Sequence, residues 1–517
     1  MEFGDISMKI GTFFSFGTLS VVSLIGAIIG VLLMLVRIWN AFSLSEPLQL
    51  TTSGYEEESL YAMWKYLKGL KIYADRHSIP YAQSFFNWLF YQSYGFFIST
   101  FISLFSLSLG WIPTIGRFLT LVGALIGVFV CYSSFVKVSC IKDSVLKMLV
   151  ISFSLTVFLG PLVGFWVFTV RPDIWGFVCE VTGVFLFWRY YSVNNIKAII
   201  FASLALYCSW AFKHSYIYTV TAISLFLLLR KEFKVIGIFL LLMITFYSIT
   251  FLLGDENYFN SFFCHTTRGF SFCSIKENIL KTALKSFPAI VTLISSFVFV
   301  FLTKELKREI IKEDRFLFPI LLLFVTTILS ILGSGVIGAA DNYCFMEIYT
   351  LSLVAVTLLN KIYDGRVIYN EKNKNKLKIF VCLMIFGWGI HLAAMIPIFL
   401  GYKGVLSVYP QHVDFMKKQK CIERFPKPLF VDNMYLSLPW MNPSEPYIFG
   451  NALYMISAEA DDLYDFDGFG RLIKEGHYKT LFLNEKLKTF FGADLSGYKI
   501  LPEKCEGFYV YIKNDQP

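Results

Sequence analysis

Long apolar runs separated by polar turns fill the chain up to Leu400. A run of about twenty apolar residues is the length that crosses a bilayer as an α-helix. We therefore predict about eleven membrane-spanning helices. They lie near 13–39, 116–136, 148–169, 174–188, 197–212, 215–229, 235–253, 287–303, 316–337, 345–360 and 379–400.

One more segment, residues 84–112, is apolar enough to span but fits the pattern poorly. A full crossing there would reverse the side of every later loop. Gly95, Gly110 and Pro113 permit bends. We expect a juxtamembrane or re-entrant piece on the outer side, within a first external loop over residues 42–112.

The pattern changes after residue 401, where polar and apolar residues mix and Pro, Asp and Gly punctuate the chain. Short alternating runs at 480–485 and 507–513 predict strands. The stretch 458–478 predicts a loop followed by a helix. We expect a membrane domain over residues 1–401 and a small α/β domain over residues 402–517.

Composition supports a polytopic α-helical membrane protein. The 517 residues are 56% hydrophobic and 16% charged, whereas soluble chains carry about 25% charged residues. The net charge of +9 therefore indicates basic cytoplasmic loops rather than a nucleic-acid partner. The first apolar run follows a segment with one lysine and no convincing cleavage site, so we interpret it as a retained span.

The basic loops alternate as the positive-inside rule requires when the N-terminus is cytoplasmic. The C-terminal domain is then extracytoplasmic, and the protein is expected in a bacterial plasma membrane. The inner loops contain Lys137, Lys142 and Lys147; Arg189 and Lys197; Arg230, Lys231 and Lys234; and the segments 304–315 and 370–378.

Three consecutive carboxylates, Glu56, Glu57 and Glu58, follow the first span. Carboxylates beside a membrane are costly unless water, a cation or a reaction requires them. One of them could act as a general base. The alternative is a solvated acidic loop.

Further candidates lie at the predicted outer ends of later spans. Arg171, Pro172 and Asp173 could belong to an active site. The alternative is an ordinary helix start, where Pro and Asp are both common. Lys213, which His214 follows, breaks the positive-inside pattern and could bind a phosphate, or it could instead extend to the headgroups. Arg268 lies on the outer loop 254–285 and could contact a phosphate or lipid headgroups.

The first loop also resembles that of the GT-C glycosyltransferases. The resemblance rests on the acidic pair, a helix ending at Gly69, then Tyr73, Pro80 and an aromatic run. The family usually has Asp-Glu where this chain has Glu-Glu. The segment Arg171 to Asp173 and the turn Gly338 to Tyr343 are similar to later elements of the family. Lys213 matches a lysine of the family only in part, because the His-Ser that follows it replaces other residues.

The resemblance implies an enzyme similar to protein O-mannosyltransferases and lipid A aminoarabinose transferases. It implies a polyprenyl-phosphate-sugar donor and a glycan, lipid or protein acceptor. Glu56 or Glu57 would be the base and Asp173 a second acid. Arg171, Lys213, His214 and Arg268 would contact the donor phosphate.

Several alternatives remain open at this stage. A divalent metal ion between Glu57 and Asp173 would suit their carboxylates. A transporter or flippase of a lipid-linked or anionic solute would share the membrane architecture, although we find no internal repeat. A non-catalytic scaffolding protein is the third class.

The ten cysteines show no metal-binding spacing. An oxidising exterior permits disulfides. We expect bridges between Cys264 and Cys273 on the outer loop, and between Cys421 and Cys505 in the C-terminal domain.

Overall fold

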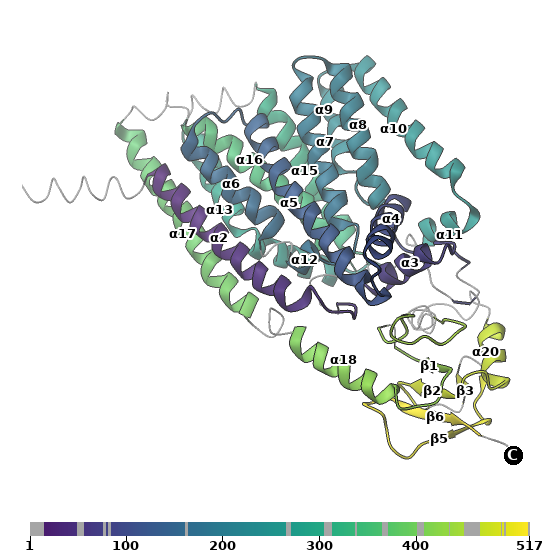
Figure 1. The fold of residues 1–517 in the computed structure, drawn as a ribbon. Helices are drawn as coiled ribbons and strands as arrows, with labels where there is room; N and C mark the ends of the chain where they lie inside the picture. Colours follow the sequence, from purple (N-terminus) through teal and green to yellow (C-terminus); the bar gives the residue numbers. More distant parts are fainter. Residues whose placement is uncertain are drawn as a thin grey trace, which may run out of the picture.

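The architecture is a bundle of long helices with a small α/β domain at one end, as Figure 1 shows. This computed structural model describes residues 15–48, 56–75, 79–80, 84–160, 164–264, 270–303, 313–336, 339–363, 371–400, 408–433, 435–448, 466–486, 489–490 and 493–514.

Each of the eleven predicted spans coincides with a helix of the described chain. These helices are α2 (Phe16–Ala41), α5 (Ile112–Val138), α6 (Ser144–Leu159), α7 (Asp173–Tyr191), α8 (Asn195–Phe212), α9 (Tyr218–Leu229), α10 (Phe233–Leu253), α13 (Phe287–Phe301), α15 (Asp314–Ser334), α16 (Phe345–Tyr363) and α17 (Glu371–Leu400).

Not all of these helices are long and apolar enough to cross a membrane by themselves. Among the described residues, seven helices meet that requirement, or eight if the bent pair leading into α13 forms one span. The helices α6 and α9 are apolar but shorter. The chain is therefore a polytopic helical membrane protein, and the count of eleven crossings stays a prediction.

The helices begin and end where local chemistry requires. The Asp143 side chain accepts hydrogen bonds from the Val145 and Leu146 backbone N–H groups and so caps α6. Asn194 caps α8 in the same way through the Lys197 N–H. Both caps lie on turns whose lysines are predicted to be cytoplasmic.

Burial separates central from peripheral helices. In the most apolar window of α16, 83% of the residues are buried, whereas the corresponding value for α10 is 17%. An apolar helix that leaves most of its surface exposed needs an apolar solvent around it. Consequently α16 occupies the centre of the bundle and α10 faces lipid.

The first loop, predicted to be external, forms two helices, α3 (Glu57–Leu67) and α4 (Trp88–Phe105), and the short η1 (Leu109–Trp111). Gly69, at φ +67°, ends α3, and the next residue, Leu70, donates its N–H to the Lys65 carbonyl. The two helices approach closely at Gly95, where a Cβ atom would lie 2.4 Å from the Tyr66 ring.

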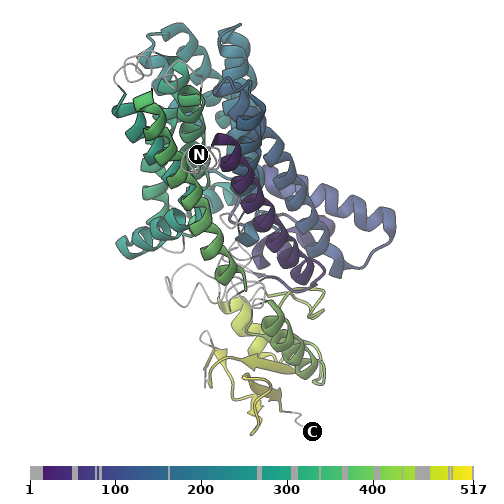
Figure 2. The same cartoon turned by 90° about the vertical axis from the view of Figure 1, so that its left-hand side faces the viewer.

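Figure 1 shows α4 nearly end-on, and Figure 2 shows it projecting sideways from the bundle. It therefore runs across the long helices, and it is not among the candidate spans. The position of residues 84–112 as a juxtamembrane or re-entrant piece on the outer side stays a prediction.

Short helices continue this end of the bundle. They are η2 (Gly164–Val167), α11 (Glu256–Cys264), α12 (Phe272–Lys285) and η4 (Asp341–Cys344). The chain bends by 78° between α12 and α13. This end therefore has several helix termini close together, which is where backbone and side-chain polar groups accumulate.

The C-terminal domain confirms both predicted strands. It begins with α18 (Val408–Ile422), and its strands are β1 (Leu429–Val431), β2 (Thr480–Leu483), β5 (Tyr498–Ile500) and β6 (Tyr509–Lys513), in the sheet order β1-β2-β6-β5. The β1–β2 pair is parallel and the other two pairs are antiparallel. Helix α20 (Phe466–Lys474) and a β3–β4 hairpin (Thr489–Phe490, Ala493–Asp494) complete the described part.

The two domains are in contact through the first loop. Leu438 is buried in the core that α3 and α4 form, and the Trp64 and Tyr447 rings lie 4.8 Å apart. The Trp440 indole donates a hydrogen bond of 3.1 Å to the Ser45 carbonyl. The predicted boundary at residue 401 lies outside the described residues.

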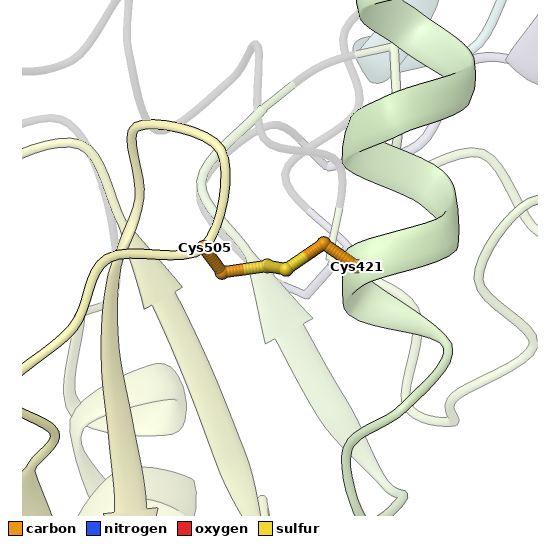
Figure 3. Close-up of a disulfide and its surroundings, with 2 residues drawn as sticks. All are labelled: Cys421 and Cys505. Carbon is orange, nitrogen blue, oxygen red and sulfur yellow. A yellow bond between two sulfur atoms is a disulfide. The ribbon is translucent and has the colours of Figure 1, made fainter.

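The cysteine predictions have different outcomes. Cys421 and Cys505 form a disulfide that joins the end of α18 to the loop before β6 (Figure 3). Cys273 is a free thiol. The predicted Cys264–Cys273 bridge is therefore wrong, since one of its two thiols is not oxidised.

The basic turns and the C-terminal domain define a topology prediction. Figure 1 shows the C-terminal domain at one end and the α7–α8 and α9–α10 turns at the other. We expect reporter fusions at Lys142 and Lys234 to report the cytoplasm and a C-terminal fusion to report the exterior, because short basic loops stay inside. A cytoplasmic C-terminal reporter would contradict this orientation.

Candidate active site

Glu56 is held in a buried ion pair with Arg117. The Glu56 side chain is fully buried at the start of α3, and Arg117 is fully buried near the start of α5. The guanidinium contacts both carboxylate oxygens, at 2.6 Å and 3.2 Å. Backbone N–H groups of Leu48 and Val170 also donate to this carboxylate, at 2.7 Å and 2.9 Å.

Arg117 also binds the end of α2 and the segment after it. Its two terminal nitrogens donate to the backbone oxygens of Ala41, Phe42, Leu44 and Glu46. The pair therefore joins α2, α3, α5 and the segment before α7. Sequence analysis missed Arg117; its signal was a single arginine within an apolar span, where a charge needs a partner.

Glu57 and Glu58 occupy the first turn of α3 and are almost completely buried. Burial raises the pKa of the Glu57 carboxyl to about 8, and the charge of Arg171 acts in the opposite direction. Burial likewise raises the pKa of Glu58 to about 7. The Tyr91 hydroxyl donates to Glu58 at 2.6 Å, so Glu58 belongs to the packing between α3 and α4.

The predicted residues Arg171, Asp173 and Lys213 meet in one cluster. Lys213 Nζ lies 2.5 Å from one Asp173 oxygen, and Arg171 Nε lies 3.1 Å from the other. The Asn342 amide donates to Asp173 at 2.6 Å, and the Tyr216 hydroxyl donates to the Asp173 backbone carbonyl at 2.8 Å. Asp173 is therefore a carboxylate that holds two cations in fixed positions.

Aromatic rings enclose Arg171 on two sides. Its guanidinium carbon lies 4.7 Å from the centre of the Phe86 ring and 5.0 Å from that of Trp166. Such cation–π contacts hold a guanidinium group in place. The Trp166 indole donates to Asp341 at 3.2 Å, and Asp341 forms an ion pair with Lys285.

The structure therefore brings Glu56 and Glu57 close to the cluster that contains Arg171 and Asp173. Val170 donates to Glu56, and Arg171 follows Val170 in the chain and acts electrostatically on Glu57. His214 lies at the edge of this region, where its ring is 5.2 Å from that of Phe262. Arg268 lies outside the described residues.

Glu180, which lies in the middle of α7, has a local structural role. It accepts a hydrogen bond of 3.0 Å from the Thr219 N–H at the start of α9. A carboxylate at that position satisfies a backbone donor that the helix leaves unpaired. It thereby fixes the turn that carries Lys213.

The predicted metal position does not fit the side chains present. Both Asp173 oxygens accept hydrogen bonds from Lys213, Arg171 or Asn342. Among the residues that the structure describes, no group of three or more His, Cys, Asp or Glu side chains could hold a metal ion. The ammonium and guanidinium groups supply the positive charge beside Asp173.

An apolar cavity of about 690 Å³ lies next to the first loop. Its walls come from the end of α3, the start of α4, α8 and the end of α10. Tyr73 belongs to this wall and donates its hydroxyl to the Phe86 carbonyl at 2.8 Å. Through this bond Tyr73 connects the cavity wall to Phe86, whose ring packs on Arg171. Leu253, which also lines the cavity, is 83% exposed.

Comparison with known proteins gives a fold but no relative in sequence. No family model matches the chain, and no curated protein matches its sequence. The structure is similar to ArnT from Cupriavidus metallidurans in the apo state, with a TM-score of 0.55 and 11% identity over 92% of this chain and 95% of that chain. ArnT bound to undecaprenyl phosphate gives a TM-score of 0.52 and 11% identity over 93% and 96%.

The oligosaccharyltransferase of Archaeoglobus fulgidus in the apo form is also similar, with a TM-score of 0.52 and 12% identity over 95% of this chain and 74% of that chain. ArnT and the oligosaccharyltransferase are both GT-C membrane glycosyltransferases. The GT-C-like fold that the first loop suggested is thereby confirmed.

The Arg117–Glu56 pair yields a stability prediction. We expect Arg117→Met to lower the free energy of unfolding by about 3–5 kcal/mol, because it leaves a buried carboxylate and several carbonyls unpaired. Thermal unfolding of the purified protein in detergent would measure this. Arg230→Met, which breaks a pair whose side chains are 35% and 39% exposed, should cost about 1 kcal/mol or less. Equal losses in the two variants would contradict the prediction.

Proposed function

We propose that this protein is a membrane glycosyltransferase that moves a sugar from a polyprenyl-phosphate donor to an acceptor on the extracytoplasmic face. The observation that carries the proposal is the convergence of a buried carboxylate, Glu57, with the cations Arg171 and Lys213 in a GT-C-like fold. A base and a phosphate-binding pair are the two groups that this transfer requires.

The lipid-linked donor is supported by two observations. The similar ArnT structure contains undecaprenyl phosphate. The apolar cavity that Tyr73 helps to line has a rim at Leu253 on the lipid-facing helix α10, so a hydrocarbon chain could enter it from the bilayer. Tyr73 is bonded to Phe86, which packs on Arg171, so Arg171 would lie near the phosphate end of such a ligand.

Glu57 is the proposed general base. Both oxygens of Glu56 are occupied by Arg117 and two backbone N–H groups, so Glu56 is suited to positioning α3. Glu57 would take the proton of an acceptor hydroxyl as that oxygen bonds to the anomeric carbon. The bond from that carbon to the phosphate oxygen breaks, and the configuration at the carbon inverts.

The leaving group is the carrier phosphate, which gains negative charge as the bond breaks. Lys213 and Arg171 would donate to it, and Asp173 would keep both cations in place beforehand. Cations that are already positioned stabilise developing charge without reorganisation. In this arrangement the Lys213 and Arg171 side chains would stabilise the charge on the departing phosphate, and Asp173 would act as a positioning residue.

The raised pKa of Glu57 predicts a pH dependence. Only the carboxylate form is a base, so activity should fall about tenfold per pH unit below pH 8. Glu57→Gln should reduce kcat by roughly 10²–10⁴. Arg171→Gln should move the acid limb to higher pH, because Arg171 lowers the pKa of Glu57. Transfer of radiolabelled sugar from a lipid-linked donor, measured across pH, tests these expectations.

Glu423→Gln serves as the control, because Glu423 is exposed and follows α18 on the same side of the protein. It should keep the wild-type rate and pH profile. If folded Glu57→Gln enzyme retains wild-type activity, Glu57 is not the base.

Lys213 gives a separate prediction. Lys213→Ala should lower kcat by more than it raises the donor KM, since the phosphate charge increases as the bond breaks. We expect a loss in kcat of about tenfold or more. Steady-state kinetics with varied donor measure both constants. Lys197→Ala, an exposed lysine at the opposite end of α8, should change neither, and a change in KM alone for Lys213→Ala would argue against the proposed role.

A further inference from the structure

A second lysine–carboxylate pair lies beside the Arg171 cluster. Lys285 is the last residue of α12, at the 78° bend before α13, and Asp341 opens η4. Their ion pair is mostly buried, but the lysine side chain is 13% exposed and the aspartate side chain only 4%. The lysine is therefore the member of the pair that a ligand could reach.

Two contacts connect this pair to the proposed phosphate site. Trp166 donates its indole N–H to Asp341 at 3.2 Å, and its ring packs under Arg171 at 5.0 Å. Asn342, the residue after Asp341, donates to Asp173 at 2.6 Å. Lys285 and Arg171 are thus connected through Asp341 and Trp166, and each cation is held by an aspartate of the same network.

The energetics of the pair favour a binding role over a stabilising one. A buried ion pair adds little net stability, because desolvation of both charges offsets their attraction. Such a pair does keep an ammonium group in one place. An ammonium has three N–H donors, so Lys285 could keep its contact with Asp341 and still donate to a phosphate oxygen.

We propose that Lys285 binds the phosphate of the lipid carrier, together with Arg171 and Lys213. The inference rests on the proposed function and names a further residue of the same site. The phosphate is a singly charged diester in the donor and a monoester with additional charge after transfer. A third cation therefore favours the released carrier phosphate more than the donor, and Lys285 should affect binding of the free carrier strongly.

The test is binding of undecaprenyl phosphate and of uncharged undecaprenol to purified full-length protein in detergent. Lys285→Met should weaken binding of undecaprenyl phosphate by about tenfold or more and leave undecaprenol binding unchanged. Lys285→Arg should restore most of the loss. Lys281→Met is the matched control, because Lys281 lies one turn earlier on α12 in an exposed pair with Glu277, and it should bind both compounds as the wild type does.

The outcomes separate this inference from the proposed function. If Lys285→Met binds undecaprenyl phosphate as the wild type does, the role of Lys285 is wrong while the proposed function stands. If the variant loses both compounds in the same proportion, the residue is structural and the inference also fails. If wild-type protein prefers neither compound over the other, the phosphate site itself, and with it the proposed function, is in error.

Discussion

The arrangement of the end of the bundle that faces the C-terminal domain depends on one buried ion pair, Arg117 with Glu56. Removing two charges from water is costly, and the cost is offset only when every donor and acceptor is used. Here the guanidinium serves Glu56 and four carbonyls, and Glu56 also accepts two backbone N–H groups. Because those groups belong to α2, α3, α5 and the segment before α7, a single pair sets the position of all four relative to Glu57 and Arg171.

Pairing of buried charges also organises the proposed active site. Asp173 and Asp341 are each bound to a lysine, and Arg171 lies between the Phe86 and Trp166 rings. The cations are therefore positioned before a ligand arrives, and their side chains are mostly buried. A carboxylate such as Glu57 in those surroundings holds its proton more tightly than usual, and the nearby guanidinium limits that effect. The proposed base and the proposed phosphate site are thus electrostatically linked as well as adjacent.

Much of the architecture was predictable because it depends on local properties of the chain. The length of an apolar run fixes where a membrane helix can form, and each predicted span coincides with a helix. The alternating runs at 480–485 and 507–513 became β2 and β6 for the same local reason. The Cys264–Cys273 prediction failed because sequence proximity says nothing about side-chain geometry. By contrast, Cys421 and Cys505 are brought together by the packing of α18 on the sheet.

The sequence by itself determined the membrane class, the positions of the long apolar helices and the residue types available for chemistry, since composition and periodicity are sufficient for these. It left the roles of Glu56 and Glu57 open, and it passed over Arg117 and Lys285. The contacts in this region join partners that are distant in the chain: Arg117 lies 61 positions from Glu56, and Asn342 lies 169 positions from Asp173. Only the tertiary structure decides which charge meets which, because a buried charge takes its partner from whichever helix packs against it.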